Sequence, residues 1–426
     1  MKKLPFLFLL FIATLAAHAQ GKLTGVVLDS ATRQPLAFAS VFLANTTLGA
    51  TTTEQGEFVF PKVPAGSYDM VGSYVGYNLS KQPVTVGKAA APQSITLTLS
   101  ASGPTLGEVV VHASPHSQED YDKFSGLFLG QTAFSQQCRI TNPKNVVVFI
   151  NDSTQELVAS AKNFVEVEND ALGYRLKYYG MSFRFSPDGR AGSFDGQPVF
   201  EEMTPQDDQQ RQQWAANRAK AYAGSFTHFL RSVYTNTLKA QGFLAQRVRL
   251  QPNPAYARAE AQRQALLGQR PNGPYSIAQQ DSLDEWGGVQ PAFAVVYPGV
   301  RPIDSIRHVS ADRQHTYLRF TGDLQVAYFG ETPDPAYGQP MSPLGYSRTP
   351  YPAEREVSKV RLLARQVEIL PNGSLHDSEA VALGEYWGFE KIGEFMPLDY
   401  EPPATLAPTP AAPPRAQPAS GRAQMR

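Results

Sequence analysis

Short runs of alternating hydrophobic and polar residues fill residues 22 to 111. The segments include KLTGVVLD, AFASVFLA, EFVF, QPVTV and SITLTLS, and Gly, Pro, Asn or Ser bounds each of them. Alternation with a period of two, interrupted by turn residues, is typical of β-strands. Because almost no helical periodicity lies between these runs, the pattern predicts an all-β sandwich. Gly56 and Gly66 each follow a candidate turn, where we expect a left-handed backbone.

Residues 22–111 also resemble a known family. Their order is similar to the carboxypeptidase regulatory-like domain, a transthyretin-like β-sandwich common in exported proteins of Bacteroidota. In that family the matching positions are turn and core residues, so the resemblance implies a fold and an envelope setting but no activity. The matching residues are Gly25, Val27, Asp29, Pro35, Ala39, Val41, Thr53, Gly56, Phe58, Pro64, Gly66, Tyr68, Val75, Gly76 and Tyr77.

The rest of the chain reads as a polar linker, 112–120, and a larger region, 121–401, in which strand-like runs are interrupted by helices. A helix start is predicted at Thr204-Pro205, and a second helix is expected from Ser225 to Gly242, where apolar residues recur at helical spacing. A further polar, alanine-rich helix is expected around Ala255 to Leu267. The pattern predicts an α+β, β-rich domain. This region resembles an uncharacterised region that follows the same sandwich in other exported proteins of Bacteroidota.

The two ends of the chain have their own composition. Residues 1–19 combine a short basic start, an apolar run and the small residues of Ala17-His18-Ala19, as secretory signal peptides do. The apolar run is too short to cross a bilayer, so we expect export without a transmembrane segment, to the periplasm, the cell envelope or the medium. Residues 402–426 are rich in Pro and Ala and are expected to be disordered.

Charge and cysteine content narrow the function classes. The chain has 38 basic and 38 acidic residues and no basic stripe, which argues against binding to nucleic acid. Cys138 is the only cysteine. It cannot form an intramolecular disulfide, and we interpret it as a small core residue rather than a nucleophile.

Catalytic and metal motifs are weak. The His-x-x-Glu tetrads at His116 and His376 have the first spacing of a zinc carboxypeptidase, but His376 has no later histidine and His116 lies in the linker. Gly-x-Ser-x-Gly, phosphate-loop and dinucleotide-binding patterns are absent. We therefore predict no metal site and no cofactor. Carboxylates distant in sequence can still meet in a fold without leaving a motif.

One group of polar and aromatic residues suggests a binding cleft. Candidates on the second helix lie opposite its apolar stripe, and those on the preceding helix recur at a spacing of four. Planar arginines beside aromatic rings suit a carboxylate or a glycan. The alternative is a solvated helix face. The candidate binding residues are Trp214, Arg218, Tyr222, His228 and Arg231.

These observations favour an exported cell-envelope protein that binds or docks a protein or a glycan and is not an enzyme. The alternative is an envelope hydrolase, acting on peptides or glycans, whose catalytic residues are dispersed over residues 121–401. A deep pocket with converging carboxylates would favour the hydrolase, whereas a shallow groove would favour binding. A self-assembling subunit is a third possibility, and the sequence leaves the oligomeric state open.

Overall fold

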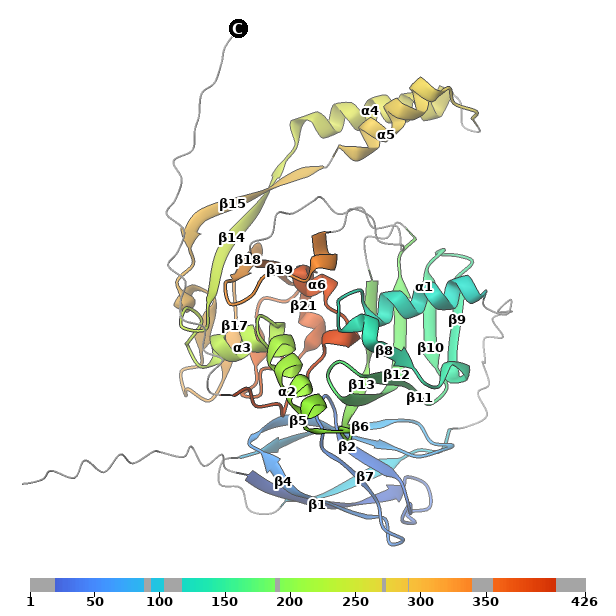
Figure 1. Cartoon of the computed structure of the whole chain (residues 1–426), viewed down its shortest axis with the longest axis vertical. Coiled ribbons are helices and arrows are strands. Elements are labelled where there is room, and N and C mark those ends of the chain that lie inside the picture. Colours follow the sequence, from blue (N-terminus) through green and yellow to red (C-terminus); the bar gives the residue numbers. More distant parts are fainter. Residues whose placement is uncertain are drawn as a thin grey trace, which may run out of the picture. The chain divides into compact units, whose positions relative to one another are not determined.

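The protein is described by a computed structural model that covers residues 20–87, 93–102, 117–187, 192–269, 273–289, 291–338 and 355–403 (Figure 1). The predicted signal peptide, 1–19, and residues 404–426 of the predicted tail lie outside the described residues. The chain forms two compact units, residues 1–112 with 197–200 and residues 113–196 with 201–426. Each unit is described by itself.

The first unit is the predicted β-sandwich. Its two sheets have the strand orders β4-β1-β7 and β3-β2-β5-β6, with β1 antiparallel to β4 and parallel to β7. The strands are β1 (Gln20–Asp29), β2 (Ser40–Leu43), β3 (Gly49–Thr51), β4 (Glu57–Pro64), β5 (Gly66–Ser73), β6 (Ser80–Val86) and β7 (Gln93–Leu99).

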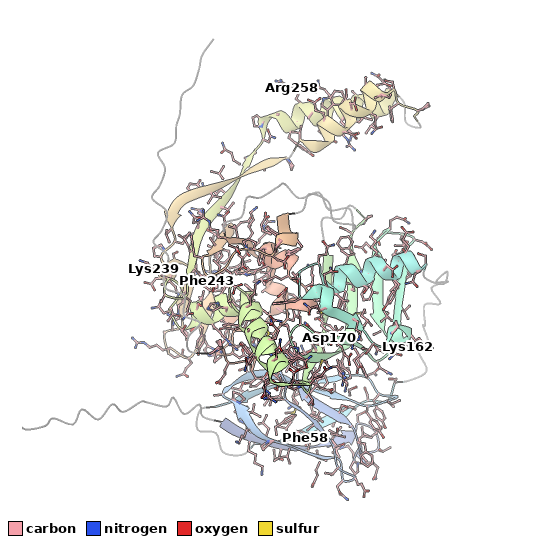
Figure 2. The ribbon with its side chains drawn as sticks, viewed as in Figure 1. Phe58, Lys162, Asp170, Lys239, Phe243 and Arg258 are labelled. Carbon is pink, nitrogen blue, oxygen red and sulfur yellow. The ribbon has the colours of Figure 1, made fainter. Side chains whose placement is uncertain are left out.

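Alternation along the strands places the apolar side chains in the core of this unit. Phe58 and Phe60, two positions apart on β4, are each 2% exposed, and their rings meet edge to face; Phe58 is labelled in Figure 2. Gly56 has a φ of 72°, as expected for the turn before β4, whereas Gly66 begins β5 without a positive φ. A turn does not require the left-handed region at every glycine, which is why the prediction for Gly66 was wrong.

Asp29, one of the residues matching the family pattern, closes the end of β1. Its Oδ1 accepts hydrogen bonds from the backbone N–H groups of Ala31 and Thr32, and its Oδ2 accepts one from the Tyr77 hydroxyl at 2.6 Å. The Tyr77 hydrogen bond is the main reason that the pKa of Asp29 is lowered to about 2. This pair is structural, as expected for a turn position.

The second unit contains a six-stranded antiparallel sheet of order β8-β11-β12-β10-β9, with β13 also paired to β12. Helix α1 packs against it through Phe124 and Phe128, which contact Phe183 and Tyr178 edge to face. The elements are α1 (Gln118–Leu129), β8 (Cys138–Ile140), β9 (Val146–Ile150), β10 (Leu157–Ala161), β11 (Phe164–Asn169), β12 (Tyr174–Phe185) and β13 (Gly192–Glu202). Because Ser117 caps α1 through its side chain, the helix begins inside the predicted linker, 112–120.

A five-stranded sheet, β15-β14-β18-β19-β21, and a three-stranded sheet, β16-β17-β20, complete the strands of this unit. Phe243 at the start of β14 is 4% exposed in a core that α3 covers with Phe229; Figure 2 labels Phe243. The strands are β14 (Phe243–Pro252), β15 (Ala292–Val300), β16 (Arg307–Val309), β17 (Thr316–Leu318), β18 (Asp323–Tyr328), β19 (Glu356–Leu362), β20 (Val367–Ile369) and β21 (Val381–Glu385).

The remaining helices differ from the sequence prediction mainly at their ends. The polar, alanine-rich helix is present as α4, and its neighbour α5 was not predicted. The helices are α2 (Asp208–Tyr222), α3 (Phe226–Tyr234), α4 (Pro254–Gln269), α5 (Ile277–Gly288) and α6 (Tyr386–Phe389), and the short 3-10 turns are η1 (Ser135–Gln137), η2 (Pro143–Asn145), η3 (Ile303–Ser305), η4 (Pro335–Gly338), η5 (Ser378–Ala380) and η6 (Ile392–Glu394). Over the described part of the chain, no helix is long and apolar enough to cross a membrane.

Candidate functional site

Helices α2 and α3, which carry the candidate binding residues, begin at side-chain caps. The predicted start at Thr204-Pro205 is wrong: Asp207 accepts a hydrogen bond from the Gln210 N–H at 2.7 Å, so α2 begins at Asp208. The predicted start near Ser225 is confirmed, because Ser225 caps α3 through its side chain. This helix ends at Tyr234 and not at Gly242, because Asn236 adopts a φ of 61° and breaks the helical backbone.

Trp214 and Arg218 point towards the neighbouring β-sheet turn. The Trp214 indole donates to the Asp170 carbonyl at 2.8 Å, and the Arg218 Nε donates to the Leu172 carbonyl at 2.7 Å. The Arg218 guanidinium also lies 3.9 Å from the centre of the Tyr174 ring. These two side chains fasten α2 to the turn between β11 and β12, so the structure gives them a packing role.

The other three candidates, Tyr222, His228 and Arg231, meet at the junction of α2 and α3. They line a hollow of about 260 Å³, which we call the hinge hollow. A hollow of this size is slightly smaller than the usual small-molecule site of about 300–1,000 Å³. Its other lining residues are Ala223, Ser232, Thr235, Thr237, Gln241, Pro402 and Pro403.

His228 is buried, with 5% of its surface exposed, so it does not lie on the solvated helix face that was the alternative interpretation of the sequence. Its ring stacks on Tyr222 with the centroids 4.9 Å apart. Nδ1 accepts a hydrogen bond from the Gly224 N–H at 3.2 Å, so Nε2 carries the hydrogen and donates to Gln241 Oε1 at 3.1 Å. Burial lowers the pKa of His228 to about 4. The imidazole is therefore neutral at pH 7 and has both nitrogens engaged.

Arg231 uses its guanidinium on the chain itself. Nε donates to the Asn372 carbonyl at 2.9 Å, Nη1 to the Tyr400 carbonyl at 3.0 Å and Nη2 to the Leu398 carbonyl at 2.7 Å. These bonds hold the segment that continues into Pro402 and Pro403 at the edge of the hinge hollow. Arg231 is thus a positioning residue, and the expectation that it clamps a carboxylate is not met by this geometry.

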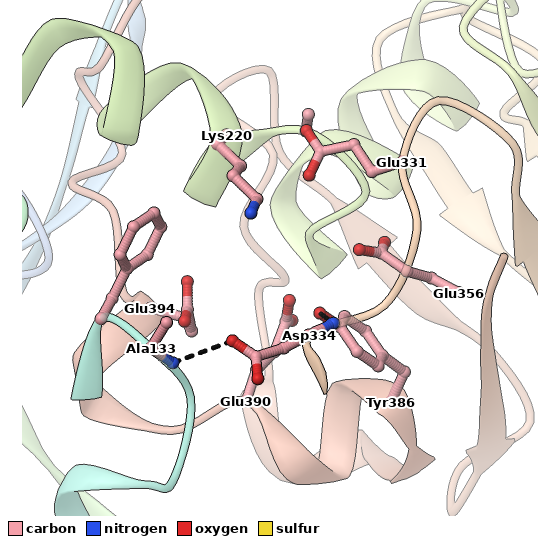
Figure 3. A pocket seen from close by; sticks show the side chains of 10 residues that line it. Ala133, Lys220, Glu331, Asp334, Glu356, Tyr386, Glu390 and Glu394 are labelled. Carbon is pink, nitrogen blue, oxygen red and sulfur yellow. Dashed lines mark hydrogen bonds between the residues drawn. The ribbon is translucent and has the colours of Figure 1, made fainter. Parts of the chain in front are cut away.

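A second hollow, of about 30 Å³, was not predicted from the sequence (Figure 3). Five carboxyl groups from three separate stretches of the chain line it, together with a tyrosine and a lysine, and Figure 3 shows these side chains around one space. The Ala133 N–H donates to Asp334 Oδ2 at 2.8 Å at its edge. We call this hollow the acidic cavity; its lining residues are Ala133, Phe134, Lys220, Ala223, Glu331, Asp334, Glu356, Tyr386, Glu390 and Glu394.

Burial controls the charge of the acidic cavity. Desolvation is the largest effect on Glu356, whose pKa is raised to about 9, and the neighbouring Glu331 adds to it. The pKa values of Glu331 and Glu394 are raised to about 7, and that of Glu390 is raised well above its usual range, in each case mainly by burial. At neutral pH the cavity thus holds a mixture of carboxylic acids and carboxylates.

Neither hollow has the form of a hydrolase site. A volume of about 30 Å³ accommodates one or two water molecules, which is too small for a sugar ring or a peptide group. The hinge hollow contains no carboxyl side chain, and its histidine is buried and neutral. Carboxyls gather in this fold, as the hydrolase alternative requires, but not around a space that a substrate fills.

The remaining sequence candidates have structural roles where they can be described. Asp377, inside the tetrad at His376, caps the N–H of Glu379 at 3.0 Å; His116 lies outside the described residues. Cys138 is half-buried, its Sγ donates to the Phe134 carbonyl at 3.5 Å, and burial raises the pKa of its thiol to about 12. Such a thiol is a poor nucleophile. Among the described side chains, no three of His, Cys, Asp or Glu are placed to hold a metal ion.

Comparisons with known proteins identify the first unit. The CarboxypepD_reg-like domain model matches residues 23–111. No curated protein matches the chain. Solved structures with local likeness include BcpA, the major pilin subunit of Bacillus cereus (17% identity, 20% of this chain and 31% of that one, TM-score 0.18), and the group B streptococcus pilus 2b backbone protein (21%, 19% and 41%, TM-score 0.17).

A DUF3823 family protein from Bacteroides ovatus also matches, at 9% identity over 43% of this chain and 82% of that one, with a TM-score of 0.16. This chain spans less than half the length of the two pilin structures. TM-scores this low do not establish a shared overall fold.

Proposed function

We propose, from the premise that residues 23–111 are a CarboxypepD_reg-like domain, that this protein is exported to the cell envelope and binds or docks there without catalysing a reaction. The β-sandwich is the docking module, and the hinge hollow of the second unit is the ligand site. The hydrolase is the alternative. The observation that carries the proposal is the hinge hollow itself, which has room for a small polar ligand but is lined by no carboxyl group and by only one histidine, whose two ring nitrogens are both hydrogen-bonded within the chain.

The chemistry of the hinge hollow fits a glycan better than a charged ligand. Arg231 is occupied by backbone carbonyls, and His228 is neutral. The hydroxyls of Thr235 and Thr237, 2.8 Å apart, and the amide of Gln241 lie along the wall. Hydroxyl and amide groups can both donate and accept hydrogen bonds, as the hydroxyls of a sugar do.

A feature of the sandwich supports the docking role. Phe38 is 66% exposed and has a φ of 60°, a conformation that bulky residues rarely adopt. Strained, exposed side chains of this kind gather at functional sites. Val75 is also an apolar side chain in the open, at 83% exposure.

Glycan binding is tested with the mature full-length chain on an array of envelope glycans, followed by calorimetry with the strongest ligand. Replacing Thr235 and Thr237 by valine should weaken binding by about tenfold or more, because the loss of one good hydrogen bond to a ligand is worth about 1–2 kcal/mol. Thr154→Val makes the same change in the β9–β10 turn and should leave affinity unchanged. If the glycan affinity is unchanged when both threonines are replaced, or if no glycan binds, the hinge hollow is not the binding site.

Docking is tested by crosslinking in cells and co-purification. We expect a specific envelope partner with the natural chain and its loss with Phe38→Ser combined with Val75→Ser, provided that both proteins accumulate equally. Recovery of the same partner with the variant would show that Phe38 and Val75 of the sandwich do not dock it. Release of new reducing ends or peptide fragments from the array ligands would favour the hydrolase.

A further inference from the structure

The hinge hollow is partly closed by the C-terminal segment of the chain itself. After η6 the chain runs along α3, and Pro402 and Pro403 then form part of the wall of the hollow. We call residues 401–403 the lid. With the lid in place the hollow has a volume of about 260 Å³, which is less than most small-molecule sites have. A ligand of ordinary size therefore needs one wall of the hollow to move.

The segment before the lid is firmly anchored. Arg231 on α3 donates from Nη2 to the Leu398 carbonyl at 2.7 Å and from Nη1 to the Tyr400 carbonyl at 3.0 Å. The Tyr400 N–H donates to the Pro397 carbonyl at 3.0 Å, and the centroids of the Tyr400 and Tyr222 rings are 5.7 Å apart. Hydrogen bonds from a charged guanidinium are roughly twice as strong as neutral ones, so the chain is fixed as far as Tyr400.

The lid has no comparable attachment. Because proline has no backbone N–H, Pro402 and Pro403 cannot donate a backbone hydrogen bond. Within the described part of the chain, no backbone hydrogen bond reaches the carbonyl of either residue. Pro402 is half-buried and Pro403 is exposed. Segments with few hydrogen bonds and little burial open at a low cost in free energy.

The other walls of the hinge hollow are held in place. Most of them belong to helices α2 and α3. In the segment that follows α3, the Thr237 N–H donates to the Ser232 carbonyl at 2.8 Å, and the Gln241 N–H donates to the Thr237 carbonyl at 2.9 Å. The Gln241 side chain is also bonded to His228. The lid is therefore the wall that moves most easily.

We propose that the lid is an autoinhibitory element, which closes the hinge hollow in the free protein and swings aside next to Tyr400 when a ligand enters. This inference rests on the proposal that the hinge hollow is the ligand site. The bonds from Arg231 keep the lid beside the hollow, so that it closes again when the ligand leaves. A lid that is mostly closed lowers the apparent affinity in proportion to the open fraction, so its removal should raise the affinity.

The test measures access to the hollow in the absence of a ligand. Ser232 lines the hollow and is 2% exposed, so Ser232→Cys places a thiol in its wall. The rate of its reaction with a thiol reagent is compared in three forms of the mature protein: the full chain, a chain ending at Pro403 and a chain ending at Tyr400. The chain ending at Pro403 is the matched control, because it lacks the tail but keeps the lid. The same three forms without the substitution give the background from Cys138.

We expect the thiol to react at least about tenfold faster in the chain ending at Tyr400 than in the other two forms, because the closed lid protects it most of the time. Equal rates in all three forms, or an equal increase in the chain ending at Pro403, overturn the proposal. Near-ultraviolet circular dichroism checks that each form is folded. If Ser232→Cys does not fold, Thr237→Cys, half-buried in the same wall, is the probe and is judged by the same rates.

Glycan affinity separates the failure of the lid from the failure of the glycan site. Calorimetry with a glycan from the array should show an affinity several-fold higher for the chain ending at Tyr400 than for the full chain. Unchanged or lower affinity despite faster labelling would show that the lid does not inhibit binding, and would overturn the inference. Faster labelling with no glycan bound by any form supports the lid but refutes the hinge hollow as a glycan site. Glycan binding with unchanged labelling refutes the lid alone.

Discussion

Protonation of His228 should destabilise the second unit in mild acid. Its pKa is lowered to about 4 in the folded protein, from an ordinary value of 6.5, because the ring is buried between Tyr222 and Phe243. The unfolded chain therefore binds a proton more readily than the folded one. The stability that this group contributes is complete above pH 6.5 and is lost as the pH falls towards 4.

The size of the effect follows from the two pKa values. One pKa unit corresponds to about 1.4 kcal/mol. Linkage over the interval from 6.5 to 4 gives a loss of about 2 kcal/mol by pH 5 and about 3 kcal/mol by pH 4. Because His228 is only 5% exposed, solvent screening reduces this figure little.

The assay compares the natural protein with His228→Asn in urea unfolding between pH 4 and pH 7.5. Asparagine is smaller and does not titrate, so the variant should be less stable at pH 7 but should lack this pH-dependent loss. The carboxyls of the acidic cavity act in the opposite sense, because their raised pKa values give stability below pH 4.5 that is lost as the pH rises. Their contribution is common to both proteins and cancels in the difference. At pH 7 the free energy of unfolding should be larger for the natural protein than for His228→Asn, and this difference should shrink by about 1–3 kcal/mol between pH 7 and pH 4. If the difference does not shrink, His228 is not buried and neutral as described.

Other positions give predictions that are independent of His228. Gly224→Ala places a Cβ against Glu356 at a φ of 76° and should lower the free energy of unfolding by about 1–3 kcal/mol, measured in urea; an unchanged value would contradict the close approach. Arg218→Ala removes hydrogen bonds to the β11–β12 turn and should lower the free energy of unfolding by about 1–3 kcal/mol in the same assay, without altering glycan affinity. A loss of glycan affinity with unchanged stability would instead show that Arg218 contacts the ligand. Cys138 should resist a thiol reagent at pH 8 until the protein is unfolded in urea, and rapid modification of the folded protein would show an accessible thiolate.

The first unit could be predicted from the sequence because its information is local. Alternation is clear in strands such as β4, whose buried residues Phe58 and Phe60 are two positions apart, and the paired strands form a sandwich around a core of apolar residues. The ends of the helices could be predicted less well from the sequence. A proline after a threonine suggested a start for α2, but the competing cap at Asp207 lies only three residues on, and sequence spacing does not tell which cap is used.

That the candidate residues bind a ligand stays a prediction. Tyr222, His228 and Arg231 do lie near one another, but helical spacing does not tell which segments cover a helix face. Here Phe243 and the segment at Tyr400 cover it, so His228 is buried and Arg231 is occupied. The acidic cavity left no pattern at all, because its carboxyls come from stretches far apart in the chain and only the tertiary fold brings them together.

Helices α4 and α5 connect to the second unit only through strands β14 and β15, and this connection makes the helical pair replaceable. Pro252 on β14 pairs directly with Ala292 on β15, so the chain leaves the sheet and returns to it at the same rung. Within the two helices, only Ala259 and Leu283 are buried among the residues described. Helices α4 and α5 are thus an insertion at the tip of the β14–β15 hairpin. Its length and surface can change, or a two-residue turn can replace it, while the strand register and both hollows remain as they are.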